Sequence, residues 1–227
     1  MNLNADLGEG AGDDEAILAC VDSASVACGI HAGSVSVTIA TAWRCIALGI
    51  EVGAHPGYDD RASFGRVEQP LSVAEIEALI AFQVTGLAAV APISYVKPHG
   101  ALYHRCQHDP AAADVLAFVA KEHGVGVVGQ PGFEIIAAAE RARIPGYREG
   151  FADRRLRPDG SLAPRTQPGA VLEPAQAAEQ AVALARTELY DTICVHGDTP
   201  GAGQVAAAVR RALDEARIAT TPLGGRL

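Results

Sequence analysis

The sequence predicts an α/β fold built on a parallel sheet, and three observations lead to this prediction. Short apolar runs alternate with longer helical patterns along almost the whole chain, as in repeated βα units. The 227 residues show no composition shift or low-complexity linker, so we expect a single domain over residues 1–227. Hydrophobic residues make up 49% of the chain, as in globular proteins, and a chain of this length can bury most of its apolar surface without disulfides or structural metals.

Seven short apolar runs are expected to form the strands. They cover residues 2–5, 25–27, 51–54, 94–97, 126–128, 148–152 and 192–195. Residues 218–223 are either a short eighth strand or a segment that closes the fold. A closed barrel and an open, doubly wound sheet both fit this alternation.

Helical patterns fill most of the intervals between these runs. The expected helices cover residues 13–21, 35–48, 72–90, 110–123, 132–143, 174–188 and 201–216. The third begins with the capping-box pattern of Ser72 and Glu75. Residues 153–170 are rich in Arg, Pro and Gly and predict a long functional loop.

Ionisable side chains gather where the predicted strands end. In both candidate folds this is the edge that binds ligands. One histidine there is commonly structural, but four histidines with carboxylates and a lysine predict acid–base chemistry. The residues are Asp6 and Glu9, His31, His55, Lys97 with His99, Asp153 with Arg154, and His196 with Asp198. The fifth run, 126–128, is followed by Gly-Gln-Pro-Gly, which contains no ionisable side chain.

Several residues allow a structural interpretation beside a functional one. Lys97 is one of only two lysines among 18 basic residues, and a lysine amine can be tuned by burial. Cys28 lies three residues before His31 and is either a nucleophile or a small packed residue. His104, His108 and His123 are expected to be structural, the first two in a polar loop.

Composition and motif searches exclude several classes of protein. The net charge of −9 argues against nucleic acid and anionic membranes as partners. The five cysteines form no CxxC pair, and the first strand runs directly into Asp6 without a signal-peptide pattern, so we expect a cytoplasmic protein. The apolar stretch 79–96 is interrupted by polar residues and is not a membrane span. The sequence contains no Walker-type nucleotide loop, GxSxG elbow or HExxH motif.

Taken together, the strand-end motifs resemble the LamB/YcsF family, the A subunit of the bacterial ATP-dependent 5-oxoprolinase. The matching segments are Asn-Ala-Asp-Leu-Gly-Glu at 4–9, Ala-Cys-Gly-Ile-His-Ala-Gly at 27–33, Gly-Ala-His-Pro-Gly-Tyr at 53–58, Phe-Gly-Arg at 64–66, Val-Lys-Pro-His-Gly-Ala-Leu-Tyr at 96–103, Phe-Ala-Asp-Arg at 151–154 and Val-His-Gly-Asp-Thr-Pro at 195–200. They span nearly the whole chain in order. Ser34 stands where the family usually has an acidic residue, and we expect it to cap a helix instead.

The resemblance implies a distorted (β/α) barrel of about seven parallel strands, related to the glycoside hydrolase/deacetylase superfamily. It implies cleavage of 5-oxo-L-proline to L-glutamate, coupled to hydrolysis of ATP, together with subunits B and C. Because this chain lacks a nucleotide loop, we expect ATP, with its Mg²⁺, to depend on the partner subunits. Association of identical copies is compatible with the sequence.

Roles for the predicted site residues follow as hypotheses. Asp6 or Glu9 would be the general base, the four histidines would move protons, and Lys97 would stabilise developing negative charge. Arg154 would bind the substrate carboxylate. Asp153 and Asp198 would orient histidine or arginine partners, and Tyr103 would contact substrate.

Two alternatives stay open at the level of sequence. Asp6, His31 and His55 could form a facial site for a divalent metal, as in a metal-dependent deacetylase or amidohydrolase. A regulatory subunit without catalytic activity is the second alternative.

Overall fold

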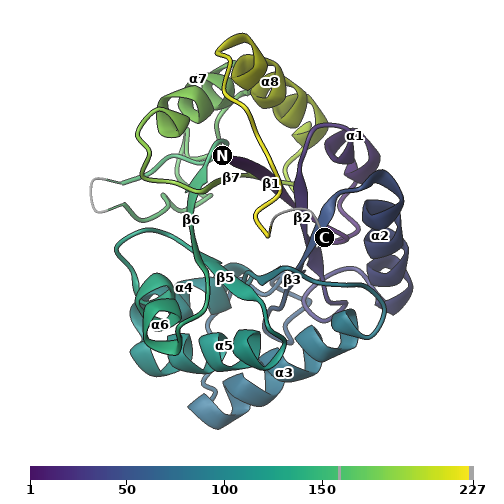
Figure 1. Cartoon of the computed structure of the whole chain (residues 1–227), viewed down its shortest axis with the longest axis vertical. Helices are drawn as coiled ribbons and strands as arrows, with labels where there is room; N and C mark the ends of the chain where they lie inside the picture. The colour runs from purple at the N-terminus through teal and green to yellow at the C-terminus, as the bar shows by residue number, and fades with distance from the viewer. Residues whose placement is uncertain (158–159, 225–227) are drawn as a thin grey trace.

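The computed structural model describes residues 1–157 and 160–224, and these residues form a closed barrel of seven parallel strands. The strands follow one another around the barrel in sequence order, and β1 closes it by pairing with both β2 and β7. Figure 1 shows the helices arranged around the outside. Of the two architectures that fit the alternation, the barrel is therefore confirmed.

The elements alternate as predicted, with one addition. The strands are β1 (Asn2–Leu7), β2 (Ser23–Ala27), β3 (Glu51–His55), β4 (Tyr95–Val96), β5 (Gly126–Gly129), β6 (Gly146–Phe151) and β7 (Thr192–His196). The helices are α1 (Asp14–Leu18), α2 (Val35–Leu48), α3 (Val73–Ala88), α4 (Gly100–His108), α5 (Pro110–Glu122), α6 (Glu134–Ala142), α7 (Pro174–Ala185) and α8 (Ala202–Glu215).

The prediction of a polar loop around His104 and His108 was wrong, because both lie on α4. The other predicted helices are present, with ends that differ by a few residues. Ser72 and Glu75 form the expected capping box at the start of α3. Ser34 caps α2 by accepting a hydrogen bond from Val37 N at 3.2 Å, as expected.

The predicted loop 153–170 is irregular where it is described. Isolated bridges join Arg154 to Val171 and Leu156 to Leu162. Residues 158–159 lie outside the described part of the chain.

Alternate residues of the strands face opposite sides of the barrel wall. On β1, Leu3 and Ala5 belong to the hydrophobic core beneath the helices. Asn4 lies between them and turns inward, where it donates to Thr192 Oγ1 at 2.7 Å. The inside of this barrel is therefore a hydrogen-bonded polar layer, and the apolar core lies between barrel and helices.

A tyrosine ring fills part of the barrel interior below the strand ends. Tyr95 is fully buried, and its hydroxyl lies 3.3 Å from Ser25 Oγ. The ring passes over Gly53 so closely that a Cβ there would lie 2.1 Å from a ring carbon. Gly53 is thus needed for close approach, one of the roles that glycine serves in strands.

The C-terminal segment closes the end of the barrel at which the strands begin. Thr221 N donates to Met1 O at 2.8 Å, and the backbone N–H groups of Leu223 and Gly224 each donate to the Glu51 carboxylate at 2.7 Å. Figure 1 shows this segment crossing the barrel mouth, so of the two predicted alternatives it is the closing segment. Ligands must therefore enter from the opposite end, where the strands finish.

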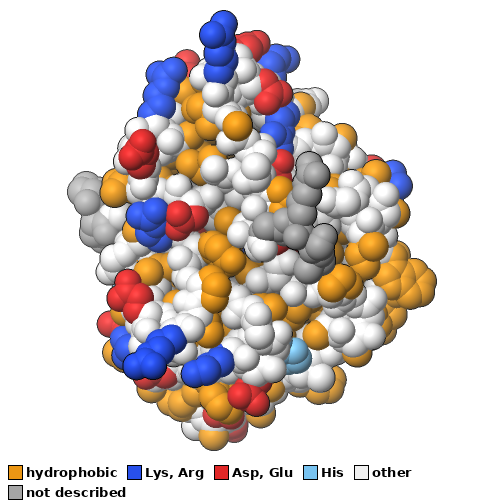
Figure 2. Space-filling view, in the orientation of Figure 1, with side chains coloured by type: hydrophobic (Ala, Val, Ile, Leu, Met, Phe, Trp, Pro, Cys, Tyr) orange, Lys and Arg blue, Asp and Glu red, His pale blue; other side chains and the backbone are white. Residues whose placement is uncertain are grey.

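The outer surface is of mixed character. In the view of Figure 2, acidic and basic side chains are interspersed around the edge of the face. Across residues 1–157 and 160–224, no helix combines the length and hydrophobicity needed to cross a membrane.

Candidate active site

A pocket of about 600 Å³ opens at the carboxyl ends of the strands. This volume lies within the range of small-molecule sites, roughly 300–1,000 Å³. Seven of the residues predicted from sequence line it: Asp6, His55, Lys97, His99, Tyr103, Arg154 and His196. The other four lie behind this wall, in contact with residues that line it: Glu9, His31, Asp153 and Asp198.

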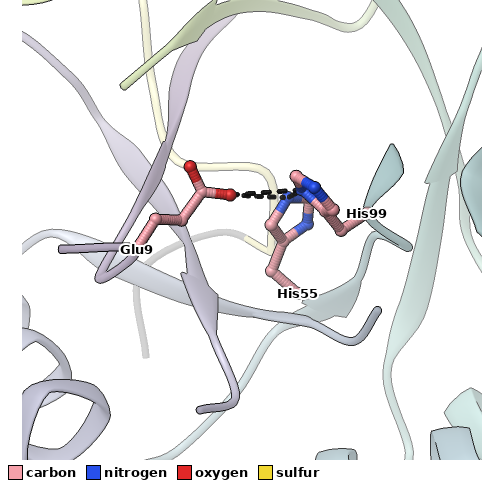
Figure 3. A group of neighbouring side chains, drawn as sticks. All are labelled: Glu9, His55 and His99. Atoms are coloured by element: carbon pink, nitrogen blue, oxygen red, sulfur yellow. Dashed lines mark hydrogen bonds and ion pairs between the residues drawn. The ribbon is translucent and has the colours of Figure 1, made fainter. Parts of the chain in front are cut away.

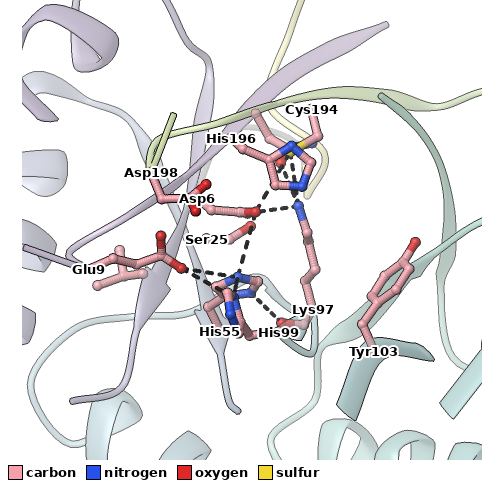
Figure 4. Close-up of polar contacts among 12 residues, drawn as sticks. Asp6, Glu9, Ser25, His55, Lys97, His99, Tyr103, Cys194, His196 and Asp198 are labelled. Carbon is pink, nitrogen blue, oxygen red and sulfur yellow. Dashed lines mark hydrogen bonds and ion pairs between the residues drawn. The ribbon is translucent and has the colours of Figure 1, made fainter. Parts of the chain in front are cut away.

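Lys97 lies at the base of the pocket between two carboxylates. Its Nζ is 2.7 Å from Asp6 Oδ1 and 2.8 Å from Glu149 Oε1, and it also contacts Cys194 Sγ at 3.1 Å. Figure 4 shows its side chain rising from β4 towards Asp6 and Cys194. Burial alone would lower the pKa of Lys97, but the neighbouring carboxylates outweigh it and hold the pKa well above its ordinary value. Lys97 is therefore a fixed cation.

Asp6 is correspondingly a fixed anion. Burial would raise its pKa, but Lys97 and His55 hold the pKa well below the ordinary range of aspartate. A carboxylate so stabilised in its charged form is a weak base. The geometry thus favours an electrostatic role for Asp6 over the predicted role of general base.

Glu149 is a site residue that the sequence prediction missed. It is 0% exposed and comes from the middle of β6, not from a strand end. Its second oxygen accepts from the hydroxyl of Tyr103 at 3.2 Å. Burial raises the pKa of Glu149 despite the ion pair with Lys97. An acidic residue inside a predicted strand was the available signal, because such a residue needs a buried partner.

Three histidines and Glu9 form a compact cluster beside the lysine. His99 Nδ1 lies 3.1 Å from His55 Nε2 and 3.2 Å from Glu9 Oε1. Figure 3 shows the Glu9 carboxylate pointing towards the two imidazole rings. His31 stacks on His99 with ring centroids 4.0 Å apart, and its Nε2 is 3.4 Å from Glu9 Oε1. Gly57 permits this packing, since a Cβ there would lie 2.6 Å from His31 Nδ1.

The alternative of a metal site at Asp6, His31 and His55, left open by the sequence, differs from the set of ligand atoms that the structure brings together. Within the described residues, the group whose ligand atoms all lie within 4.8 Å of one another is Glu9, His55 and His99. His31 instead supports Glu9 from behind. All of these residues lie at or near the carboxyl ends of strands, and the directions of their side chains determine which ligand atoms converge.

His196 and Asp153 form an oriented pair on the opposite wall. His196 Nδ1 lies 2.9 Å from Asp153 Oδ1, and the backbone N–H of His196 donates to Asp153 Oδ2 at 3.3 Å. The carboxylate fixes the proton on Nδ1, which leaves Nε2 as the acceptor nitrogen. Asp198 contacts arginines, since it pairs with Arg66 and, at 2.8 Å, with Arg165.

Arg154 gives the rim of the pocket a cationic group with unused hydrogen-bonding capacity. Its Nη2 donates to Ala163 O at 2.6 Å, while its buried Nε has no hydrogen-bond partner among the described residues. Burial and nearby Arg165 lower the pKa of Arg154 to about 10, so it stays charged at neutral pH. Gln107, which also lines the pocket, has a buried amide without a partner in the same part of the chain.

Cys28 and the three histidines that were expected to be structural lie in different surroundings. Burial raises the pKa of Cys28 to about 12, which opposes the role of nucleophile because the thiolate is the reactive form. His104 and His108 line the pocket, although they were expected to be structural. His123 caps the C-terminus of α5, three residues before β5 begins, and pairs with Thr85 at 3.2 Å.

Comparison with known proteins gives consistent matches over the whole chain. The model of the LamB/YcsF family matches residues 1–226. A protein of Streptomyces griseus, named as the A subunit of 5-oxoprolinase, is 44% identical, over 96% of this chain and 97% of that protein. One of the same name from Chloroflexus aggregans is 42% identical, over 96% of both chains. The crystal structure of a lactam utilization protein from Thermus thermophilus superposes with a TM-score of 0.90 at 34% identity, covering 97% of this chain and 98% of that one.

Proposed function

This chain belongs to the LamB/YcsF family, and from this premise we propose that it is the ring-opening component of an ATP-dependent 5-oxoprolinase. The reaction is the cleavage of 5-oxo-L-proline to L-glutamate coupled to ATP hydrolysis, carried out with subunits B and C. The names of its relatives, which designate one lettered subunit of 5-oxoprolinase, support a multi-subunit enzyme. The name of the Thermus protein supports a lactam substrate.

The observation that carries the proposal is the pairing of two kinds of group in one pocket. The substrate is a five-membered lactam with one carboxylate. Arg154 lines the pocket, its buried Nε–H has no partner among residues 1–157 and 160–224, and its planar guanidinium suits two-point contact with a carboxylate. Lys97 and His196 line the same pocket and supply a fixed cation and an oriented imidazole for the lactam.

An unstrained lactam resists hydrolysis because its amide resonance must be lost. Transfer of the γ-phosphoryl group of ATP to the lactam oxygen releases ADP and gives an imidate-type ester. A first water adds to that carbon, and the C–N bond breaks as the ring nitrogen takes up a proton. A second water releases phosphate from the resulting γ-glutamyl phosphate and leaves L-glutamate. The sum consumes one ATP and two waters.

The residues around His196 and Lys97 have roles in this scheme. His196 accepts the proton of the attacking water at Nε2, while Asp153 holds the ring and stabilises its charged form. Lys97 stabilises the negative charge that develops on oxygen, and Asp6 and Glu149 hold its ammonium group in place. Tyr103 fixes Glu149 and contributes to the pocket wall.

Activation by ATP, with its Mg²⁺, is assigned to subunits B and C. The sequence offers no Walker-type nucleotide loop, which supports this division. A cytoplasmic location is part of the proposal, because the co-substrate is ATP and the cysteines of the described chain are all free.

The test is release of L-glutamate from 5-oxo-L-proline, measured with and without subunits B and C. We expect turnover only in the complete mixture and its loss with Asp6→Asn or Lys97→Ala in correctly folded protein. Full ATP-dependent turnover by this chain alone would refute the division of labour. Normal turnover of a complex carrying either variant would instead favour a regulatory subunit without catalytic activity.

A further inference from the structure

We propose that Glu9, His55 and His99 bind a divalent transition-metal ion at the wall of the pocket. All three are buried, and their ligand atoms lie within 4.8 Å of one another. Two imidazoles and one carboxylate form the facial ligand set of many transition-metal sites, which leaves further coordination positions open.

Backbone carbonyls determine which ring nitrogen of each histidine carries its proton. His55 Nδ1 lies 2.7 Å from Lys97 O, and His99 Nε2 lies 2.9 Å from Phe64 O. A carbonyl can only accept, so each of these nitrogens must donate. The other nitrogen of each neutral ring, His55 Nε2 and His99 Nδ1, therefore presents a lone pair. This outer hydrogen bond is also the usual arrangement around metal-binding histidines.

The two lone pairs face each other and a carboxylate. His55 Nε2 and His99 Nδ1 are 3.1 Å apart, and Glu9 Oε1 lies 3.2 Å from the latter and 3.9 Å from the former. Three acceptor atoms at these separations repel one another unless a cation lies between them. The cation is either a metal ion or an additional proton on one ring.

The separations match the edges of a coordination sphere. Ligands bound at about 2.1 Å lie about 3.0 Å apart when they subtend 90° and about 3.4 Å apart when they subtend 109°. The measured edges of 3.1 and 3.2 Å fall between these values. The third edge, 3.9 Å, corresponds to a wider angle between His55 and Glu9.

The surroundings hold the ligands in place and connect them to the pocket. His31 stacks on His99 and contacts Glu9 Oε1, so it supports two of the ligands. His55 and His99 line the pocket, so a bound ion would be in contact with it. Imidazole ligands favour ions such as Fe²⁺, Co²⁺, Ni²⁺ or Zn²⁺ over Mg²⁺ or Ca²⁺.

The experiment measures metal binding by the purified chain without substrate or partner subunits. After treatment with a chelator, the protein is titrated with Co²⁺, whose visible absorption reports coordination, and with Zn²⁺ by calorimetry. We expect one ion per chain. Glu9→Gln and His99→Gln should each weaken binding by about 100-fold or more, since even loss of outer-shell partners costs about 10–100-fold. His123→Gln, at the end of α5, is the matched control and should bind as wild type.

If neither Co²⁺ nor Zn²⁺ binds saturably, the proposal is overturned, and the cation between the ligand atoms is instead an additional proton on one histidine ring. Stoichiometric binding that survives both ligand variants overturns it as well. Circular dichroism establishes that the variants fold. If one does not, the ¹⁵N shifts of the histidine rings in wild-type protein decide, since two rings must respond to Zn²⁺. Because no turnover is measured, this result is independent of whether the chain opens lactams.

Discussion

The ion pairs of Lys97 allow a stability prediction with a characteristic pH dependence. Lys97→Met keeps most of the length of the side chain but removes the charge that lies between Asp6 and Glu149. Both carboxylates are almost fully buried, at 4% and 0% exposure, so neither can turn to water. Removing one partner of a buried ion pair costs about 3–5 kcal/mol. For a chain of this size that corresponds to a fall in Tm of about 6–20 °C.

The loss should depend on pH in a defined direction. In wild-type protein the pKa of Asp6 is depressed, so its stabilising contribution is present above the ordinary pKa and is lost only in acid. Without Lys97, burial and mutual repulsion would raise the folded pKa values of Asp6 and Glu149. A raised folded pKa gives stability that is present in acid and is lost as the pH rises through it. The difference between wild type and variant should therefore be smallest near about pH 4 and largest near about pH 8.

Urea unfolding followed by circular dichroism between these pH values measures both effects. Lys121, the other lysine, is exposed on α5, and Lys121→Met should change the free energy of unfolding by less than about 0.5 kcal/mol. The double variant Lys97→Met with Glu149→Gln should recover part of the loss, because it restores the net charge of the group. A loss below about 1 kcal/mol that does not vary with pH would refute the assignment of Lys97 as a buried, paired cation.

Three further predictions concern the proposed reaction in the complete complex. Arg154→Met should raise KM for 5-oxo-L-proline by about 10–100-fold with a smaller effect on kcat, since a hydrogen bond to a charged group is worth about 1.5–3 kcal/mol. An unchanged KM would show that Arg154 does not bind the substrate. Asp153→Asn should lower kcat by about 100-fold or more by releasing the His196 ring, and adding His196→Gln to this variant should not cause a further loss of similar size. Fully additive losses in the double variant would contradict the proposal that Asp153 acts through His196. Cys28→Ala should retain activity within about threefold, and iodoacetamide should modify Cys28 slowly at pH 8 because the pKa of its thiol is raised to about 12. Loss of activity on either treatment would instead support Cys28 as a nucleophile.

The architecture was predictable because each βα unit carries its own local signals. The capping box at Ser72 and the glycines and prolines between apolar runs place the elements to within a few residues. The helix α4 escaped prediction because it has no such signal. It begins at Gly100, where φ is +55°, after His99, which makes no side-chain cap. Barrel closure was not visible locally either, since it depends on the pairing of β1 with β7.

The site was predictable where residues follow a strand and hidden where they lie within one. His55 and His196, at strand ends, were found by position alone. Glu149 was not, because the strand-end rule assumes that the barrel interior below the site is filled with apolar side chains. Here β1 and β7 line the interior with polar residues such as Asn4 and Thr192. A long side chain such as Lys97 can therefore reach an acidic partner one layer deeper.

The choice between a general base and a metal ligand for Asp6 could not be settled from sequence, because its two oxygens lie beside different networks. Oδ1 is held by Lys97 at 2.7 Å, whereas Oδ2 lies 3.6 Å from His55 Nε2. The lysine network fixes the charge of Asp6, and the histidine cluster receives part of the resulting negative potential. A cation among Glu9, His55 and His99 would thus be stabilised by a carboxylate that need not coordinate it. The ion pairs of Lys97 and the histidine cluster are consequently coupled through Asp6, so a substitution in one network should alter the electrostatics of the other.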